Sequence, residues 1–183
     1  LTYLPYLHRF YAPADARSAF VATCDLAEHY GGHVIGIPRD NLPILSKQDE
    51  SGPLWETTDA WEPITEYRKF KGAKRAILAL GAPAFLAGDV AHKLGDVDVH
   101  IVNGFPVDSK SLSSLVARYP KGVVTIEDGF IGTAETGLRG FAALIAGMAS
   151  EVGCSVGHLG ITDPRMAPSE GHMETWEHFG MTK

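Results

Sequence analysis

One short segment, residues 36–45, carries the side chain whose type and position point most clearly to ligand binding. An apolar run, His33–Ile37, predicts a short buried strand that Pro38 ends. Arg39 therefore follows the carboxyl end of a strand, which is where open α/β sheets bind ligands. Its planar guanidinium suits a two-pronged grip on phosphate or carboxylate. The segment indicates an anion-binding residue at Arg39, with a solvated surface charge as the alternative.

A glycine-rich segment, residues 129–140, joins a predicted strand to a predicted helix. Its backbone N–H groups could cradle an anion. However, its glycines at 129, 132, 137 and 140 fit neither the dinucleotide fingerprint nor the P-loop. Close packing of a helix on a sheet is the favoured interpretation.

The remaining reactive side chains do not form an independent active site. Glu127 and Asp128 are adjacent at the end of a strand, so they point to opposite sides of the sheet. The eight histidines are scattered without metal-type spacing. Cys24 and Cys154 lie in no nucleophile motif and are typical of buried thiols in a reducing compartment. We expect no catalytic, cofactor or metal residue on this chain.

The first α/β block positions Arg39. Asp15 is a plausible N-cap for a helix, and the strand His33–Ile37 follows it. The predicted apolar face of this helix contains Ala16, Ala19, Phe20, Thr23, Ala27 and Tyr30. A single helix with one or two strands cannot close a core. We therefore predict that residues 1–46 are the C-terminal remnant of a neighbouring domain and that residues 47–69 are a linker.

The second block, residues 70–183, is regular and is predicted to fold as a domain of its own. Four strands alternate with helices, the longest of which is expected from about Thr133 to Glu151. The predicted strands are Arg75–Leu80, Val97–Val102, Gly122–Glu127 and Val156–Ile161. This alternation predicts an α/β fold with a mostly parallel sheet and helices on both faces.

Composition narrows the partners. The 183 residues are 45% hydrophobic and 21% charged, and the net charge of −6 with no basic block argues against nucleic acid. No apolar run approaches the length of a membrane span, and we expect a cytoplasmic protein. Residues 1–20 are rich in large apolar side chains, which predicts homodimer contacts there. These side chains are Leu1, Tyr3, Leu4, Tyr6, Leu7, Phe10 and Tyr11.

The order of these motifs resembles the transketolase family. The Pro13-Ala-Asp15 helix start and the Ile37-Pro-Arg-Asp-Asn-Leu-Pro segment look like the end of the transketolase pyrimidine-binding domain. The strand Ile77–Gly81, the Thr125-Ile-Glu-Asp-Gly129 motif and the terminal residues 168–182 are similar to its C-terminal domain. Deoxyxylulose-phosphate synthases share most of this pattern but lack the Asn-Leu-Pro continuation.

The resemblance implies a thiamine-diphosphate-dependent enzyme that moves a two-carbon ketol unit between sugar phosphates. In that family the arginine matching Arg39 grips the substrate phosphate. Asp40 stands where glutamine is common and would weaken this hold, and Pro38 replaces serine. These departures leave a non-phosphorylated or unusual acceptor as an alternative.

Thiamine diphosphate and Mg²⁺ would be held by the remaining transketolase domains or a separate subunit, so this chain alone should not be catalytic. The alternatives are a non-catalytic ligand-sensing or subunit-assembly module and the C-terminal part of a 2-oxoacid dehydrogenase or oxidoreductase subunit.

Overall fold

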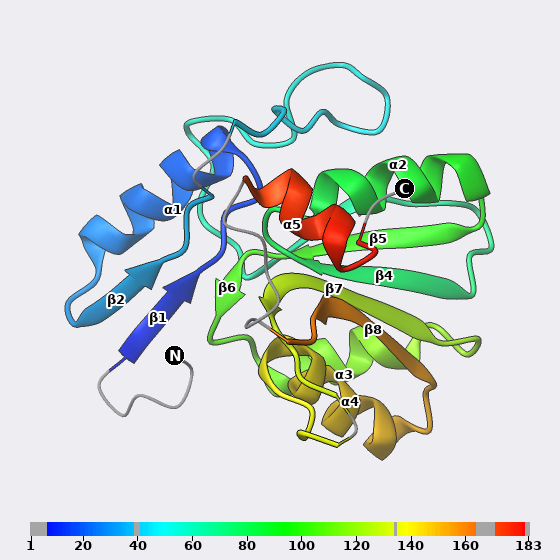
Figure 1. Cartoon of the computed structure of the whole chain (residues 1–183). Coiled ribbons are helices and arrows are strands. Elements are labelled where there is room, and N and C mark those ends of the chain that lie inside the picture. Colours follow the sequence, from blue (N-terminus) through cyan, green and yellow to red (C-terminus); the bar gives the residue numbers. More distant parts are fainter. Residues whose placement is uncertain (1–6, 39–40, 134, 164–170, 182–183) are drawn as a thin grey trace.

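Two β-sheets organise the chain (Figure 1). The computed structural model describes residues 7–38, 41–133, 135–163 and 171–181. One sheet has the order β2-β1-β6 and the other the order β3-β5-β4-β7-β8. The strands are β1 (Leu7–Tyr11), β2 (Gly32–Ile35), β3 (Ile64–Arg68), β4 (Arg75–Leu80), β5 (Val97–Val102), β6 (Gly104–Phe105), β7 (Val123–Phe130) and β8 (Val156–Ile161).

The five-stranded sheet is parallel from β5 to β8, and only β3 pairs antiparallel, on the outer side of β5. Successive side chains of a strand face opposite sides, so the sheet supports two cores. Leu78 lies in the core under α3 (Ser109–Ala117) and α4 (Gly140–Val152). Its neighbour Ala79 lies in the core under α2 (Ala84–Leu94) and α5 (His172–His178). The predicted α/β architecture, with helices on both faces of a mostly parallel sheet, is confirmed (Figure 1).

The three-stranded sheet ties the two predicted blocks together. β1 pairs parallel with β2, and α1 (Ala16–Glu28) connects them. On its other side β1 pairs antiparallel with β6, which directly follows β5 in the chain. Val21 of α1 also shares one apolar core with Ile101 of β5. The chain beyond residue 70 therefore supplies a strand to the first sheet, and the division at 46 and 70 stays a prediction.

The predicted linker, residues 47–69, contributes regular structure. β3 lies within it, and Trp55 is buried in the common core. The Gln48 side chain donates to the Lys69 carbonyl and accepts from the Lys69 N–H, both at 2.8 Å. This amide occupies the end of an edge strand as a neighbouring peptide would.

Two details of the sequence prediction are wrong, and one lies on residues that the structure does not describe. The buried face of α1 consists of Ser18, Val21 and Ala22, whereas Phe20 and Tyr30 are exposed. Helix α4 begins at Gly140 and not near Thr133. Leu1–Tyr6 lie outside the described residues.

In the predicted dimer contact, Tyr11 is fully buried within the chain and cannot serve as an exposed contact. Its ring packs edge-on against Trp61, with the ring centroids 5.2 Å apart.

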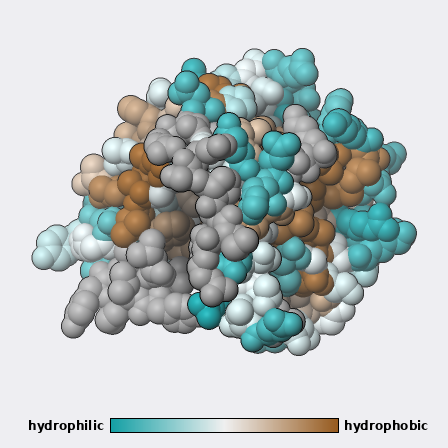
Figure 2. Space-filling model, viewed as in Figure 1, coloured by the Kyte–Doolittle hydropathy of each residue, from teal (hydrophilic) through white to brown (hydrophobic). Residues whose placement is uncertain are grey.

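Apolar side chains reach the surface beside α2 and β7–β8, where brown residues gather on the right of Figure 2. A hollow of about 80 Å³ lies there. It is lined by Ile77, Leu86, Ala87, Val90, Val124, Ile126, Leu159 and Met181.

Candidate functional site

The first residues of the segment 36–45, Gly36 to Pro38, line a pocket at the carboxyl ends of β1, β2 and β4. The pocket has a volume of about 190 Å³ and lies where the two sheets meet. It is lined by Phe10, Ala12, Pro13, Gly36, Ile37, Pro38, Leu80, Gly81, Ala82 and Asp128. Complete small-molecule sites usually exceed roughly 300 Å³, so this pocket suits one end of a ligand.

The segment 36–45 is fixed at both ends. Gly36 donates its N–H to the Tyr11 carbonyl at 2.9 Å. Leu45 donates its N–H to the Asp15 carboxylate at 2.8 Å. Arg39 and Asp40, between these anchors, lie outside the described residues. The anchors define where the chain enters and leaves this part of the segment.

Asp15 serves two elements because its two carboxylate oxygens have different donors. One oxygen accepts the Ser18 N–H at 2.8 Å and caps α1, which confirms the predicted N-cap. The other accepts the Leu45 N–H. Only 4% of Asp15 is exposed, so these hydrogen bonds replace water. The sequence indicates the cap but gives no signal for the bond to Leu45.

Gly81 brings the two sheets together at the pocket. It has a φ of 64°, and a Cβ there would lie 2.8 Å from the Ala12 carbonyl oxygen. Ala12 in turn donates its N–H to the Asn103 carbonyl at 2.7 Å. A side chain at residue 81 would separate the end of β4 from the end of β1.

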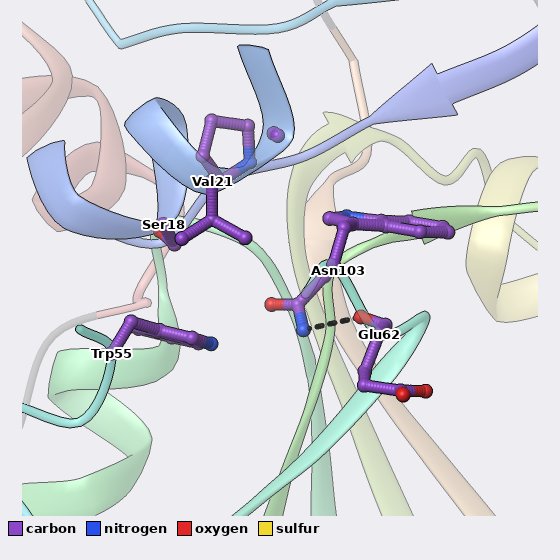
Figure 3. Close-up of a pocket in the computed structure, with 8 residues that line it drawn as sticks. Ser18, Val21, Trp55, Glu62 and Asn103 are labelled. Atoms are coloured by element: carbon purple, nitrogen blue, oxygen red, sulfur yellow. Dashed lines mark hydrogen bonds between the residues drawn. The ribbon is translucent and has the colours of Figure 1, made fainter. Parts of the chain in front are cut away.

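A second, much smaller cavity lies under α1 (Figure 3). Asn103 donates from its amide to the Glu62 carbonyl and to Thr65 Oγ1, both at 2.8 Å. Trp61 Nε1 and Asn103 Oδ1 are buried without a hydrogen-bond partner. At about 10 Å³ the cavity has room for at most one water molecule, so it is not a ligand site.

The glycine-rich segment accommodates an anion that belongs to the protein itself. Glu127 accepts the N–H groups of Ala142 at 2.8 Å and Phe141 at 3.4 Å, at the start of α4. A Cβ at Gly129 or Gly140 would lie 2.8 or 3.0 Å from the same carboxylate. Burial raises the pKa of Glu127, although the two N–H groups oppose this shift. Gly129 and Gly140 therefore leave room for the Glu127 carboxylate, whereas a Cβ on Gly137 would meet nothing within 4 Å. Close helix–sheet packing as the reason for all four glycines stays a prediction, since α4 begins only at Gly140.

The neighbouring carboxylate, Asp128, lies on the other side of β7, as the sequence predicts. It is exposed and lines the 190 Å³ pocket. Glu127 is therefore a structural helix cap, whereas Asp128 is the acid that lines the pocket.

A buried polar network lies in the α3 side of the sheet, away from the residues that line the pocket. Tyr119 donates its hydroxyl to Asp98 at 2.9 Å and lies 2.6 Å from His100 Nε2. Asp98 also accepts the Phe70 N–H at 2.8 Å. Burial lowers the pKa of His100 to about 4 and raises that of Tyr119. These hydrogen bonds connect β5 to Phe70, which follows β3, and to Tyr119, which follows α3.

Other candidate chemistry is limited in the described part of the chain. No group of three or more His, Cys, Asp or Glu residues there could hold a metal ion. No helix in that part is long and apolar enough to cross a membrane. Both cysteines are free thiols. The prediction that both are buried is wrong, because Cys24 is exposed on α1.

Solved structures share this arrangement. A split-gene transketolase, described as an inactive beta4 tetramer (four beta subunits), superimposes with a TM-score of 0.78. The match has 23% identity and covers 98% of this chain and 55% of that chain. This is the transketolase C-terminal fold. The transketolase of Pichia stipitis in complex with sedoheptulose 7-phosphate gives 0.65 at 17% identity, over 99% of this chain and 24% of that one. The Campylobacter jejuni transketolase superimposes with a TM-score of 0.61 at 17% identity, over 97% of this chain and 25% of that chain.

This chain thus spans about half of the split-gene transketolase and about a quarter of the others. No protein-family model and no curated protein matches the sequence.

Proposed function

We propose that this chain is the C-terminal part of a thiamine-diphosphate-dependent transketolase-like enzyme, in which it binds the phosphate of the sugar substrate through Arg39. The supporting observation is the position of the segment 36–45. It borders a pocket at the carboxyl ends of the strands and is anchored by Tyr11 at one end and by Asp15 at the other. A pocket that fits one end of a ligand suits a terminal phosphate.

The cofactor belongs to the rest of the enzyme in this proposal. Thiamine diphosphate would supply the carbanion chemistry of ketol transfer. The described residues offer no donor cluster for its Mg²⁺, and we assign no cofactor residue to this chain. Its own contribution is to bind and orient the substrate.

The proposed partners are the remaining transketolase domains or subunit and a second copy of the chain. The exposed Phe20 on α1 and the exposed Tyr30 just after this helix support an additional contact there, since a large apolar side chain in water favours burial. The tetramer named for the split-gene transketolase, whose chain is nearly twice as long, supports self-association of this fold. We also propose a cytoplasmic location, because free thiols are maintained in reducing compartments.

Reconstitution tests the proposal. The coding sequence upstream of residue 1, or a neighbouring gene, should encode a diphosphate-binding Gly-Asp-Gly…Asn segment. That product, combined with this chain, thiamine diphosphate and Mg²⁺, should transfer a ketol unit from a ketose phosphate to an aldose phosphate. Each component alone should be inactive. A reconstituted complex that binds the cofactor but decarboxylates 2-oxoacids instead would replace the proposed reaction with the oxidoreductase alternative.

A further inference from the structure

A larger concavity lies away from the pocket that Gly36 and Pro38 line. It has a volume of about 600 Å³, which is within the range of small-molecule sites. Three segments form it: residues 43–50, the end of β3 with Phe70, and the outer face of α2. In Figure 1 the cyan chain between β2 and β3 passes above α2. We call this concavity the β3–α2 groove.

Gly88 and Tyr67 shape the groove. A Cβ on Gly88 would lie 2.5 Å from the ring of Tyr67, so the tyrosine can pack against α2 only because residue 88 has no side chain. A glycine inside a helix is unfavourable, and the close approach of Tyr67 accounts for it here. Phe70 and Phe85, both half-buried, add flat apolar surface.

Arg68 is a fixed cation in the groove. Its guanidinium lies 3.9 Å from the centroid of the Tyr67 ring. It donates to the carbonyls of Ser46 at 2.9 Å and Tyr67 at 3.0 Å, and to the Tyr67 hydroxyl at 3.2 Å. A guanidinium has five N–H groups, so these three bonds leave two for a ligand. None of the ion pairs between described residues includes Arg68.

The charges around the groove select the kind of anion. Arg68 and Lys93 are balanced in formal charge by Glu50 and Asp89, and His92 lies at the same rim. One negative charge on a ligand can use the two remaining N–H groups of Arg68. Because the formal charges around the groove cancel, no surplus positive charge compensates a second negative charge. The aromatic walls favour a flat apolar body on the same ligand.

We propose that the β3–α2 groove binds a small aromatic monocarboxylate. The carboxylate accepts the two remaining N–H groups of Arg68, and the ring lies between Phe70 and Phe85. This site is independent of ketol transfer, because it uses neither the 190 Å³ pocket nor the cofactor.

The test measures binding of phenylacetate to the purified chain by titration calorimetry. Phenylacetate should bind saturably, and acetate, the neutral phenylacetamide and the dianionic phenyl phosphate should each bind more weakly. Arg68→Gln should weaken phenylacetate binding by on the order of tenfold, as loss of a charge-assisted hydrogen bond does. The matched control is Arg118→Gln, because Arg118 also lies over a tyrosine ring but outside the groove, and it should leave binding unchanged.

Lys93→Gln gives a second measure that does not disturb the packing, since Lys93 is exposed, and it should weaken binding severalfold. If Arg68→Gln does not fold, Lys93→Gln and the comparison of phenylacetate with phenylacetamide decide the question. Absence of saturable binding overturns the proposal. So does equal binding of the acid and its amide, or tighter binding of phenyl phosphate.

Discussion

The carboxylate of Asp15 accepts the backbone N–H of Leu45 at 2.8 Å while it also caps helix α1. One buried side chain therefore connects the start of the first helix to the end of the segment that carries Arg39. This relationship makes the stability of α1 and the position of the segment depend on the same residue.

Replacing Asp15 should therefore cost more than the loss of an ordinary helix cap. Asp15→Ala removes the cap and leaves the buried Leu45 N–H without an acceptor. We therefore expect the free energy of unfolding to fall by about 2–4 kcal/mol. Urea denaturation followed by circular dichroism measures this. Asp108→Ala is the matched control, because Asp108 also caps a helix, α3, but is exposed. Equal losses in the two variants would show that the bond to Leu45 contributes nothing.

Arg39→Ala should weaken binding of phosphorylated sugars much more than that of their unphosphorylated analogues. A charge-assisted bidentate contact is worth roughly 1.5–3 kcal/mol, so the apparent KM of the reconstituted enzyme should rise on the order of ten- to hundredfold. Asp40→Gln should lower the KM for phosphorylated sugars, because it removes a carboxylate next to Arg39. If Arg39→Ala raised the KM equally for both kinds of sugar, Arg39 would have no role in phosphate recognition.

His100 should make the fold sensitive to acid. Burial lowers its pKa to about 4, against an ordinary value near 6.5 in the unfolded chain. Between these values the unfolded chain binds a proton that the folded chain does not, so stability falls as the pH falls from about 6.5 to about 4. The slope from this one group approaches about 1.4 kcal/mol per pH unit.

His100→Gln should remove this part of the pH dependence. Denaturation midpoints measured from pH 7 to pH 4 for the wild type and the variant isolate the contribution of His100 from that of the other histidines. Parallel curves for the two proteins would mean that His100 is not held neutral by burial.

Glu127 should tolerate loss of its charge but not loss of its oxygens. Burial raises its pKa, which means that the charged form is disfavoured in the fold. Glu127→Gln keeps an acceptor for the Ala142 N–H and should stay within about 1 kcal/mol of the wild type at pH 7. Glu127→Ala leaves that N–H buried and unpaired, and its free energy of unfolding should be lower by about 2 kcal/mol or more. Thermal unfolding of both variants measures the difference, and a Gln variant as unstable as the Ala variant would rule out this account.

Local sequence patterns predict the regular part of the sheet because neighbouring residues determine where each strand begins and ends. The strands Arg75–Leu80 and Val97–Val102 were predicted with the same bounds that the structure shows. Their apolar runs end at glycine, proline or polar residues, which stop a strand wherever it packs. The predicted cap at Asp15 is equally local.

The features missed by the sequence analysis depend on distant contacts. Helix α4 begins late because Glu127, on the preceding strand, satisfies the first N–H groups at Phe141 and Ala142. The buried face of α1 is set by the strands it packs on, and small residues such as Ala22 fit there better than Phe20. The pocket beside Gly36 requires the end of β4, which no local pattern connects to it.

The two-residue strand β6 has a consequence for how the chain is made. β1 and α1 leave the ribosome long before β6, their partner on the other side, has been translated. Until then one edge of β1 has no strand to pair with, and the core that Val21 of α1 shares with Ile101 of β5 cannot form. Contacts so distant in sequence form slowly, and exposed edges favour aggregation. Nascent chains of this protein should therefore depend on chaperones until β6 emerges, and release from them should coincide with the pairing of Tyr11 and Gly104.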